Sequence, residues 1–374
     1  MAGVIGEPVQ EATAAAPTEK GSDVGEIPQW RLMVRRFKQS KLAVGGGIVL
    51  LLMYIVAALA PFLASNDYDV LNSGAKNAAP SALTWDGGLA MCGVTQTLNE
   101  DTFEFVYQKD CTKTIPIHWF GKGHEYTLFG FIKTDRHLMT VDGDTKLYLW
   151  GADTQGRDIF ARTVQGAQVS LTIGLLGVAI STVLATLIGT ISGYFGGIVD
   201  NAIQRVMEII LSVPTLPLWA TLAAVLPRDM PVERRYFFIT LILSLVVWAN
   251  TARQVRGKVL GYAHADYVNA ARAAGSSHSR IIVTHMVPNA ISHIVVVAAL
   301  AIPATIIAET SLSFLGIGML PPAVSWGVLL KDAQEIAVVT QYPWMLIPAI
   351  AVVIAVTCFQ LLGDGVRDAV DPYG

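Results

Sequence analysis

The sequence predicts an all-α polytopic membrane protein with about six transmembrane helices and a small extracytoplasmic insert. Hydrophobic residues make up 53% of the 374 positions and charged residues only 15%, whereas a soluble domain carries roughly 25% charged residues. The apolar residues lie in long uncharged runs between short charged loops, the pattern that a bilayer requires. Each run is long enough, or nearly so, to cross about 30 Å of hydrocarbon; the runs are residues 42–63, 171–191, 209–226, 236–252, 281–308 and 336–363.

The first 64 residues divide into a polar tail and a first membrane segment. Residues 1–29 are rich in Ala, Glu, Pro and Gly without an apolar period, which predicts a disordered cytoplasmic tail. Residues 30–64 carry a basic flank followed by the first apolar run. A cleaved signal peptide is the alternative, but its apolar region would span only about 7–15 residues. We therefore expect a retained transmembrane helix.

Basic residues give the expected orientation, because short loops rich in Lys and Arg stay in the cytoplasm. With a cytoplasmic amino terminus, and leaving out residues 1–29 and 65–150, twelve basic residues fall in the inner stretches and six in the short outer ones. Both termini are then cytoplasmic, and residues 65–150 form an extracytoplasmic insert.

The insert is polar and contains alternating aromatic residues, as in residues 103–107, which predicts a small strand-rich unit. Cys92 and Cys111 lie in it, on the oxidising side of the membrane, where a disulfide is expected. A bond closing this loop would stabilise the insert by roughly 3 kcal/mol. Two free thiols are the alternative. Cys358 lies in an apolar run and is interpreted as a packing residue.

Proline and glycine mark two further features of the membrane segments. Pro214 and Pro217 interrupt the third run, and such breaks survive in a membrane only where neighbouring helices or water satisfy the freed carbonyl groups. This predicts an interior helix, with either a packing kink or a position beside a polar pathway. Gly189, Gly193 and Gly197 follow a small-residue spacing that either lets two helices approach closely or forms a loop.

The segment 264–277, between the fourth and fifth runs, predicts a short cytoplasmic helix. Asp266 suits the positive end of the helix dipole, and Gly275 suits a left-handed terminating residue. Between them, Tyr267 and three alanines recur at helical spacing. This slim helix fits either a groove on another protein or a packing position at the membrane surface.

Several motifs resemble the ABC-importer permeases, and most closely their dipeptide, oligopeptide and nickel branch. Residues 266–289 (DYVNAARAAGSSHSRIIVTHMVPN) are similar to the "EAA" loop of that family. Asn269 stands where the wider motif has glutamate, and Asp266 where this branch often has one. The other matching segments are residues 151–158 (GADTQGRD), 193–200 (GYFGGIVD), 311–318 (SLSFLGIG), 321–322 (PP), 325–327 (SWG), 362–368 (LGDGVRD) and 371–372 (DP).

The resemblance implies a type I ABC importer fold, with residues 151–374 as the permease domain and residues 257–283 as its coupling loop. In that family this loop contacts the ATPase. The residues that the resemblance places at the contact are Asp266, Tyr267, Asn269, Ala270, Ala271, Arg272 and Gly275.

The resemblance also implies partners: ATPase subunits, a homologous second permease and an extracytoplasmic solute-binding protein in a bacterial inner membrane. The chain has no G-x-x-x-x-G-K-[ST] phosphate-binding motif. We therefore expect a non-catalytic subunit without cofactors, with ATP and Mg²⁺ on its partners. Membrane lipid is a further expected partner. A net charge of −3 gives no reason to expect nucleic acid. Peptides are the expected cargo, with oligosaccharides or glycosides as the alternative.

Five residues are candidates for the pathway or its gate: Pro214, Pro217, Glu309, Ser313 and Trp326. Glu309 either acts as a functional intramembrane carboxylate or lies at the outer interface, held by Ser311 or Ser313. The segment from Pro321 to Trp326 is expected to form an outer re-entrant cap. His285 and His293 are interpreted as packing residues, and no metal site is predicted.

Two other classes of function compete with transport. An intramembrane hydrolase would need a nucleophile beside a base, and Ser292 next to His293 is the nearest pair. Adjacent helical residues point to different faces, which argues against this pair. A receptor or scaffold role carried by the insert is the other class.

Overall fold

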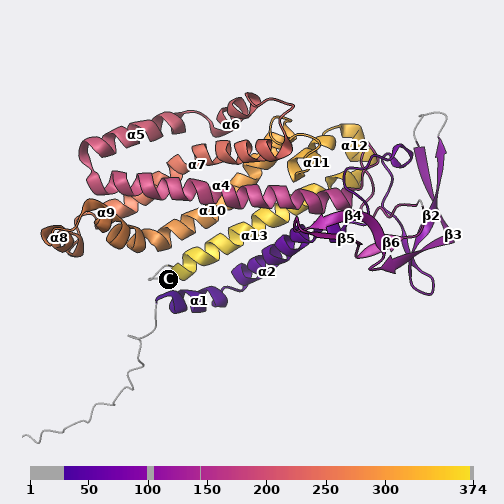
Figure 1. Ribbon diagram of the computed structural model, residues 1–374, viewed down its shortest axis with the longest axis horizontal. Helices are drawn as coiled ribbons and strands as arrows, with labels where there is room; N and C mark the ends of the chain where they lie inside the picture. The colour runs from indigo at the N-terminus through magenta and orange to yellow at the C-terminus, as the bar shows by residue number, and fades with distance from the viewer. Residues whose placement is uncertain (1–28, 99–104, 144, 371–374) are drawn as a thin grey trace, which may run out of the picture.

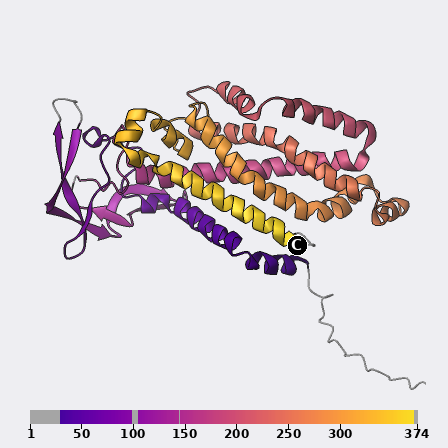
Figure 2. The same cartoon turned by 180° about the vertical axis from the view of Figure 1, so that it is seen from behind.

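The computed structural model describes residues 29–98, 105–143 and 145–370. Residues 1–28 of the predicted tail, Phe103 and Glu104 of the aromatic alternation, and the Asp371–Pro372 motif lie outside this part of the chain. The molecule is an elongated bundle of helices with a strand-containing insert at one end (Figure 1). The first described helix and the end of the last described helix, residue 370, lie together, away from the insert, in both views (Figure 2).

The bundle confirms the predicted helical fold. Within the described residues, five helical segments are long and apolar enough to span a membrane, and a bent pair makes six if it is counted as one span. The helices are α1 (Gln29–Gln39), α2 (Lys41–Ala58), α3 (Ala60–Leu63), α4 (Ile159–Phe195), α5 (Gly197–Ser212), α6 (Thr215–Ala224), α7 (Val232–Tyr262), α8 (Asp266–Ala273), α9 (His278–Ile281), the π-helix η2 (Ile282–Met286), α10 (Val287–Phe314), α11 (Trp326–Asp332), α12 (Ile336–Gln341), the 3₁₀ helix η3 (Pro343–Leu346) and α13 (Ile347–Val370).

Two predicted spans differ from the structure. The third is broken between α5 and α6 by a bend of 84°, because Pro214 in extended conformation precedes α6 and lacks the backbone donor that would continue a helix. The last span does not begin at Ile336. There α12 forms a separate short helix, and the long helix follows only after Pro343 has started a 3₁₀ turn.

Glycines let α4 pack tightly against α7. A β-carbon on Gly189 would lie 2.5 Å from the carbonyl oxygen of Ala252, and one on Gly193 would lie 2.9 Å from that of Arg256. Only glycine permits this separation of the two backbones. The predicted close approach is therefore confirmed for Gly189 and Gly193, whereas Gly197 begins α5 with a positive φ of 54°.

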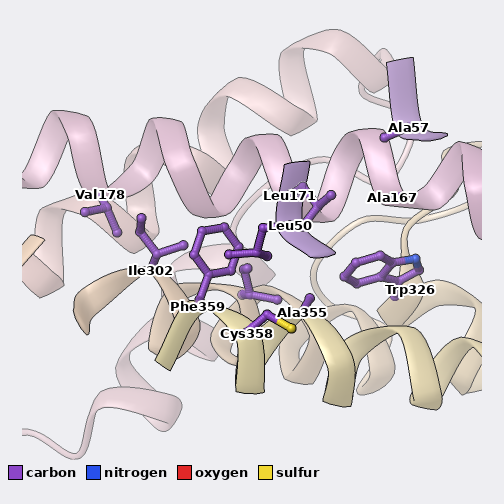
Figure 3. Packing of buried hydrophobic residues seen from close by; sticks show 11 residues of the cluster. Leu50, Ala57, Ala167, Leu171, Val178, Ile302, Trp326, Ala355, Cys358 and Phe359 are labelled. Atoms are coloured by element: carbon purple, nitrogen blue, oxygen red, sulfur yellow. The ribbon is translucent and has the colours of Figure 1, made fainter. Parts of the chain in front are cut away.

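The largest buried cluster joins four long helices. Leu50 of α2, Leu171 of α4, Ile306 of α10 and Phe359 of α13 meet in it, and Trp326 of α11 closes one end (Figure 3). Cys358 also packs there, as expected for a packing residue. The long helices are thus held together by contacts between segments far apart in the sequence.

The described residues of the insert form two small antiparallel sheets. Four strands pair in the order β1-β2-β3-β6, and β4 and β5 form a separate hairpin. The disulfide Cys92–Cys111 joins β2 to β3, so the pairing expected from the sequence is present. The elements are the 3₁₀ turn η1 (Ser73–Ala75), β1 (Leu83–Trp85), β2 (Leu89–Leu98), β3 (Phe105–Trp119), β4 (Lys122–Leu128), β5 (Ile132–Arg136) and β6 (Met139–Val141).

Candidate functional site

Helix α8 protrudes from the end of the bundle opposite the insert (Figure 1). Asp266 lies in its first turn, as predicted. The helix is held by Val268, which is fully buried against Val259, Ile281 and Met286. The sequence had singled out Tyr267 and the alanines instead of Val268. Only tertiary contacts reveal which side of so short a helix faces the bundle.

Gly275 terminates α8 in the predicted left-handed conformation, with φ +75°. Its N–H donates to the carbonyl of Arg272 at 3.0 Å, and the N–H of Ser276 donates to that of Ala271 at 3.1 Å. This pair of bonds is the Schellman arrangement, which requires a residue that tolerates positive φ. The chain can therefore turn back sharply toward α9 and α10.

The residues predicted at the ATPase contact lie mostly on the free side of α8. Ala271 is half-buried, and the exposed ones are Asp266, Tyr267, Asn269, Ala270, Arg272 and Gly275. The amide of Asn269 donates to the carbonyl of His264 at 3.1 Å. This residue, which replaces the glutamate of the wider motif, therefore fastens the start of the helix. Among the exposed residues, Tyr267 and Ala270 are uncharged, and Asp266 and Arg272 carry the charges.

A polar cluster connects α8 to the end of α4. The hydroxyl of Tyr194 is 2.9 Å from Nδ1 of His278, and Nε of Arg272 donates to the same hydroxyl at 3.4 Å. The Arg272 guanidinium also lies over the Tyr194 ring. Tyr194 belongs to the GYFGG motif, and its contacts join segments about 80 residues apart.

A second connection lies between α5 and α7. Asp200 accepts two hydrogen bonds from Arg256, from Nε at 2.6 Å and from Nη2 at 2.5 Å. Ser192 of α4 donates to the same carboxylate at 2.5 Å. A bidentate guanidinium–carboxylate pair fixes orientation as well as distance. The ends of α4, α5 and α7 are therefore tied together near the base of α8.

A groove of about 1180 Å³ opens along α7 and α10, bordered by α1, α6 and the end of α13. Polar lining residues include Asn250, Gln254, Ser292 and His293. Among the described lining residues, Arg36, Lys258 and Arg367 are basic and none is Asp or Glu. The groove is therefore polar enough to hold water and has a positive lining toward the α8 end.

The five pathway candidates do not line this groove. Pro214 and Pro217 are exposed on the surface of the bundle, so the prediction of an interior helix is wrong for this chain by itself. Thr215 and Trp219 from the same helix line the groove instead. Trp326 is buried, and its indole N–H donates to the carbonyl of Thr163 at 3.1 Å.

Glu309 and Ser313 lie in a fully buried hydrogen-bonded cluster near the insert end. The Glu309 carboxylate accepts from Ser313 at 2.8 Å and from Ser170 at 3.1 Å. Ser170 also accepts from the backbone N–H of Trp326 at 3.2 Å. The sequence suggested Ser313 as a partner but missed Ser170, which comes from α4. The cluster joins α4, α10 and α11.

Sequence reasoning also missed a buried ion-pair cluster at the insert end of the bundle. Arg157 contacts Asp153 at 2.8 Å and Asp332 at 3.1 Å, and Arg162 contacts both carboxylates. Asp153 and Arg157 belong to the GADTQGRD motif, the one signal that could have suggested it. Burial raises the pKa of Asp332, and the charges of Arg162 and Arg157 oppose that effect.

Neither histidine considered from the sequence has the neighbours of a metal site. His285 packs near Tyr267, with ring centres 6.2 Å apart, and His293 lines the groove. Within the described ranges, no group of three His, Cys, Asp or Glu residues could hold a metal ion.

Comparisons with known proteins agree with this arrangement. Residues 185–373 match the family described as "Binding-protein-dependent transport system inner membrane component", and residues 28–80 match "N-terminal TM domain of oligopeptide transport permease C". "Oligopeptide transport system permease protein OppC" of Bacillus subtilis is 31% identical over 92% of this chain and 89% of its own length. Proteins of the same name from Mycobacterium tuberculosis and Escherichia coli are 38% and 36% identical, over 65% of this chain and 82% and 79% of theirs.

These matches confirm the resemblance to ABC-importer permeases. They cover both the amino-terminal membrane segment and the helices that carry the groove and α8. The chain therefore belongs to the family of binding-protein-dependent transport system inner membrane components.

Proposed function

We propose that this chain forms half of the translocation pathway of an ABC importer for peptides. Three relatives that match this chain over 79–89% of their own length are named oligopeptide transport system permease proteins. The observation that carries the proposal is α8, an exposed helix fixed to the bundle by Val268 and ended by Gly275. A rigid helix of this kind can transmit the movement of a partner subunit.

The groove is the part of the chain that such movement would change. Helix α7 leads into α8, and α9 leads from α8 into α10. The same two long helices, α7 and α10, supply most of the groove lining. A displacement of α8 would therefore alter the spacing of the groove walls. Coupling between two sites requires an element with two positions whose balance both sites change. Helix α8 would be that element between the partner subunit and the groove.

The partners follow from the same proposal. ATPase subunits that bind ATP and Mg²⁺ would dock on α8 and perform the hydrolysis, and this chain would be non-catalytic. A homologous second permease would close the groove, and an extracytoplasmic binding protein would deliver the peptide to the insert end. The complex would lie in the bacterial inner membrane with both termini cytoplasmic. Oligosaccharides or glycosides are the second candidate cargo, since the binding protein selects the solute in this family.

Reconstitution tests the proposal. The chain, its second permease and its ATPase subunits would be placed in liposomes with the solute-binding protein encoded beside them. We expect ATP-dependent accumulation of a labelled oligopeptide. Unlabelled oligopeptide should reduce this accumulation, and an oligosaccharide should not. If the oligosaccharide accumulates and the peptide does not, the cargo is an oligosaccharide and the assignment to peptides is wrong. ATP-independent accumulation of either would overturn the mechanism.

Docking on α8 can be tested separately. A cysteine at Ala270, which is exposed on the free side of α8, should form cross-links to an ATPase subunit. A matched cysteine at Val206, exposed on α5, should not. Equal cross-linking at both positions, or none at Ala270, would contradict the docking assignment whatever the cargo.

A further inference from the structure

The β4–β5 hairpin carries exposed aromatic residues at its tip. Phe129 is 57% exposed and Phe131 is 75% exposed, and Ile132 beside them is 45% exposed. We call these three residues the aromatic tip. The turn between the strands is tight, with positive φ at Phe129 and Gly130, so both aromatic rings are presented at the end of a narrow ribbon.

The base of the hairpin is fixed to the first membrane helix. The N–H of Leu138 donates to the carbonyl of Phe62 at 2.9 Å, and the rings of Phe62 and Phe120 lie 6.1 Å apart. Phe62 belongs to α3, which directly continues α2. Arg136 at the end of β5 donates to the carbonyl of Phe120 at 2.9 Å. The hairpin is therefore anchored at one end and free at the aromatic tip.

The hairpin lies beside the insert-side end of α2, nearer the helices than β2 and β3 are (Figure 1), and the reverse view agrees (Figure 2). The outer face of α2 is exposed and apolar, as expected of a helix that faces lipid. Its exposed residues are Leu42, Ile48, Val49, Leu51, Leu52, Ile55 and Val56. The base of the hairpin, which contacts Phe62 just beyond α2, thus lies next to the end of that lipid-facing surface.

The composition of the hairpin suits the boundary between lipid and water. Aromatic residues gather at this level of a membrane protein, and basic side chains beside them can reach the phosphate groups. Lys133 follows the aromatic tip directly and is exposed, whereas Lys122 at the base lies 3.8 Å from the carboxylate of Asp135. A two-stranded hairpin is marginally stable on its own in water, so a surface that receives the tip would also hold the ribbon in place.

We propose that the aromatic tip inserts into the headgroup region of the leaflet on the insert side of the membrane. The partner is the phospholipid bilayer itself. Continuity with the lipid-facing surface of α2 favours the bilayer over a protein partner. The hairpin then acts as a strut between α3 and the lipid, and it fixes the tilt of the insert relative to the bundle. This inference does not depend on the cargo or on the docking of ATPase subunits.

Spin-label accessibility tests the insertion. The full chain, assembled with its partner subunits in phosphatidylcholine–phosphatidylglycerol vesicles, would carry Phe131→Cys in a Cys358→Ser background and a nitroxide label. Lipid insertion predicts more collisions with oxygen, which concentrates in lipid, than with a water-soluble nickel chelate. The matched control is Trp85→Cys on β1, whose side chain is 78% exposed; there the nickel chelate should dominate.

The other outcomes decide against the proposal. A label at residue 131 that reports the same aqueous exposure as the one at residue 85 would place the tip in water. A label shielded from both reagents would indicate a protein partner. Ile132→Cys, labelled in the same way, provides a second position if Phe131→Cys assembles poorly. Phe129→Ser combined with Phe131→Ser should also increase nickel access at residue 132, because the ribbon would leave the lipid surface.

Discussion

The guanidinium carbon of Arg272 lies 4.9 Å from the centre of the Tyr194 ring. Arg272 is in the last turn of α8 and Tyr194 is at the end of α4, so this contact joins the protruding helix to the longest helix of the bundle. The Tyr194 hydroxyl extends the connection to His278 at the start of α9. The position of α8 is thus set by a cation–π contact and a hydrogen bond as well as by Val268.

Removing the Tyr194 ring should loosen α8. Tyr194→Leu eliminates the cation–π contact, which contributes about 0.5–1 kcal/mol at an exposed site, together with the hydrogen bond to His278. We expect normal membrane insertion and a lower number of peptides transported per ATP hydrolysed, measured in reconstituted vesicles. Tyr194→Phe, which keeps the ring, is the matched control and should retain most of the coupling. An unchanged ratio in Tyr194→Leu would show that Val268 alone positions the helix.

Gly275 should tolerate no β-branched residue, for a reason of backbone conformation and not of space. Its φ is +75°, and a β-carbon there would meet no atom within 4 Å. Left-handed conformation costs other residues roughly 1–2 kcal/mol. Gly275→Val should therefore displace the end of α8 and uncouple ATP hydrolysis from uptake while expression remains normal.

Gly261→Val is the control for this substitution. Gly261 also has open space around it, but it lies within α7 without a positive φ. Wild-type uptake by Gly275→Val, or equal loss in both variants, would remove the special role of the left-handed terminus.

The Asp200–Arg256 pair should be replaceable only by another complementary pair. Asp200→Asn leaves Arg256 with a neutral partner, and hydrogen bonds to charged groups contribute about 1.5–3 kcal/mol. We expect a lower thermal midpoint in detergent and weaker coupling. The exchange Asp200→Arg with Arg256→Asp should recover part of the loss, although Ser192 would then lack its carboxylate partner. If the double variant is no better than the single ones, the geometry of the pair matters more than its charge.

The residue pattern of the sequence predicted the start and the end of α8. It did not predict how α8 is attached to the bundle, because that depends on contacts with residues distant in the sequence. Asp266 and Gly275 could be placed because a helix start and a left-handed end have residue preferences of their own. The side of α8 that packs against the bundle could not be predicted, since Val268 is buried by residues of α7, α9 and η2. The same holds for Ser170, which reaches Glu309 across 139 positions.

In the membrane segments, too, the sequence predicted the elements but not all of their boundaries or neighbours. Hydropathy found each apolar run because every run must match the bilayer. It could not find where α13 begins, because Ile336 to Leu346 carry no charge and continue the uncharged run, but they fold into two short helices before it. Pro343 was the available signal. The bend at Pro214 was foreseen as a break, but its exposure depends on which other helices surround α6.

Asp158 should make the stability of the insert-side end depend on pH. Its carboxylate is buried and caps α4 by accepting from the N–H of Phe160 at 2.9 Å, and it accepts from the Asn66 amide at 2.8 Å. Burial raises the pKa of Asp158 from 3.8 to about 7, although these hydrogen bonds oppose the effect. Between those values the folded protein holds a proton that the unfolded chain has lost.

A raised pKa of this kind stabilises the folded state most at low pH, and the contribution is lost as pH rises toward 7. The full change corresponds to about 4 kcal/mol. The thermal midpoint of the wild type in detergent should therefore fall between about pH 4 and about pH 7 more steeply than that of Asp158→Asn. Asparagine keeps an oxygen for the Phe160 N–H but has no proton to lose in this range.

Because other groups titrate in the same pH window, the quantity to compare is the difference between the two slopes of thermal midpoint against pH. The exposed Glu125→Gln should follow the wild-type curve, and parallel curves for Asp158→Asn and the wild type would show that the Asp158 carboxyl stays ionised throughout.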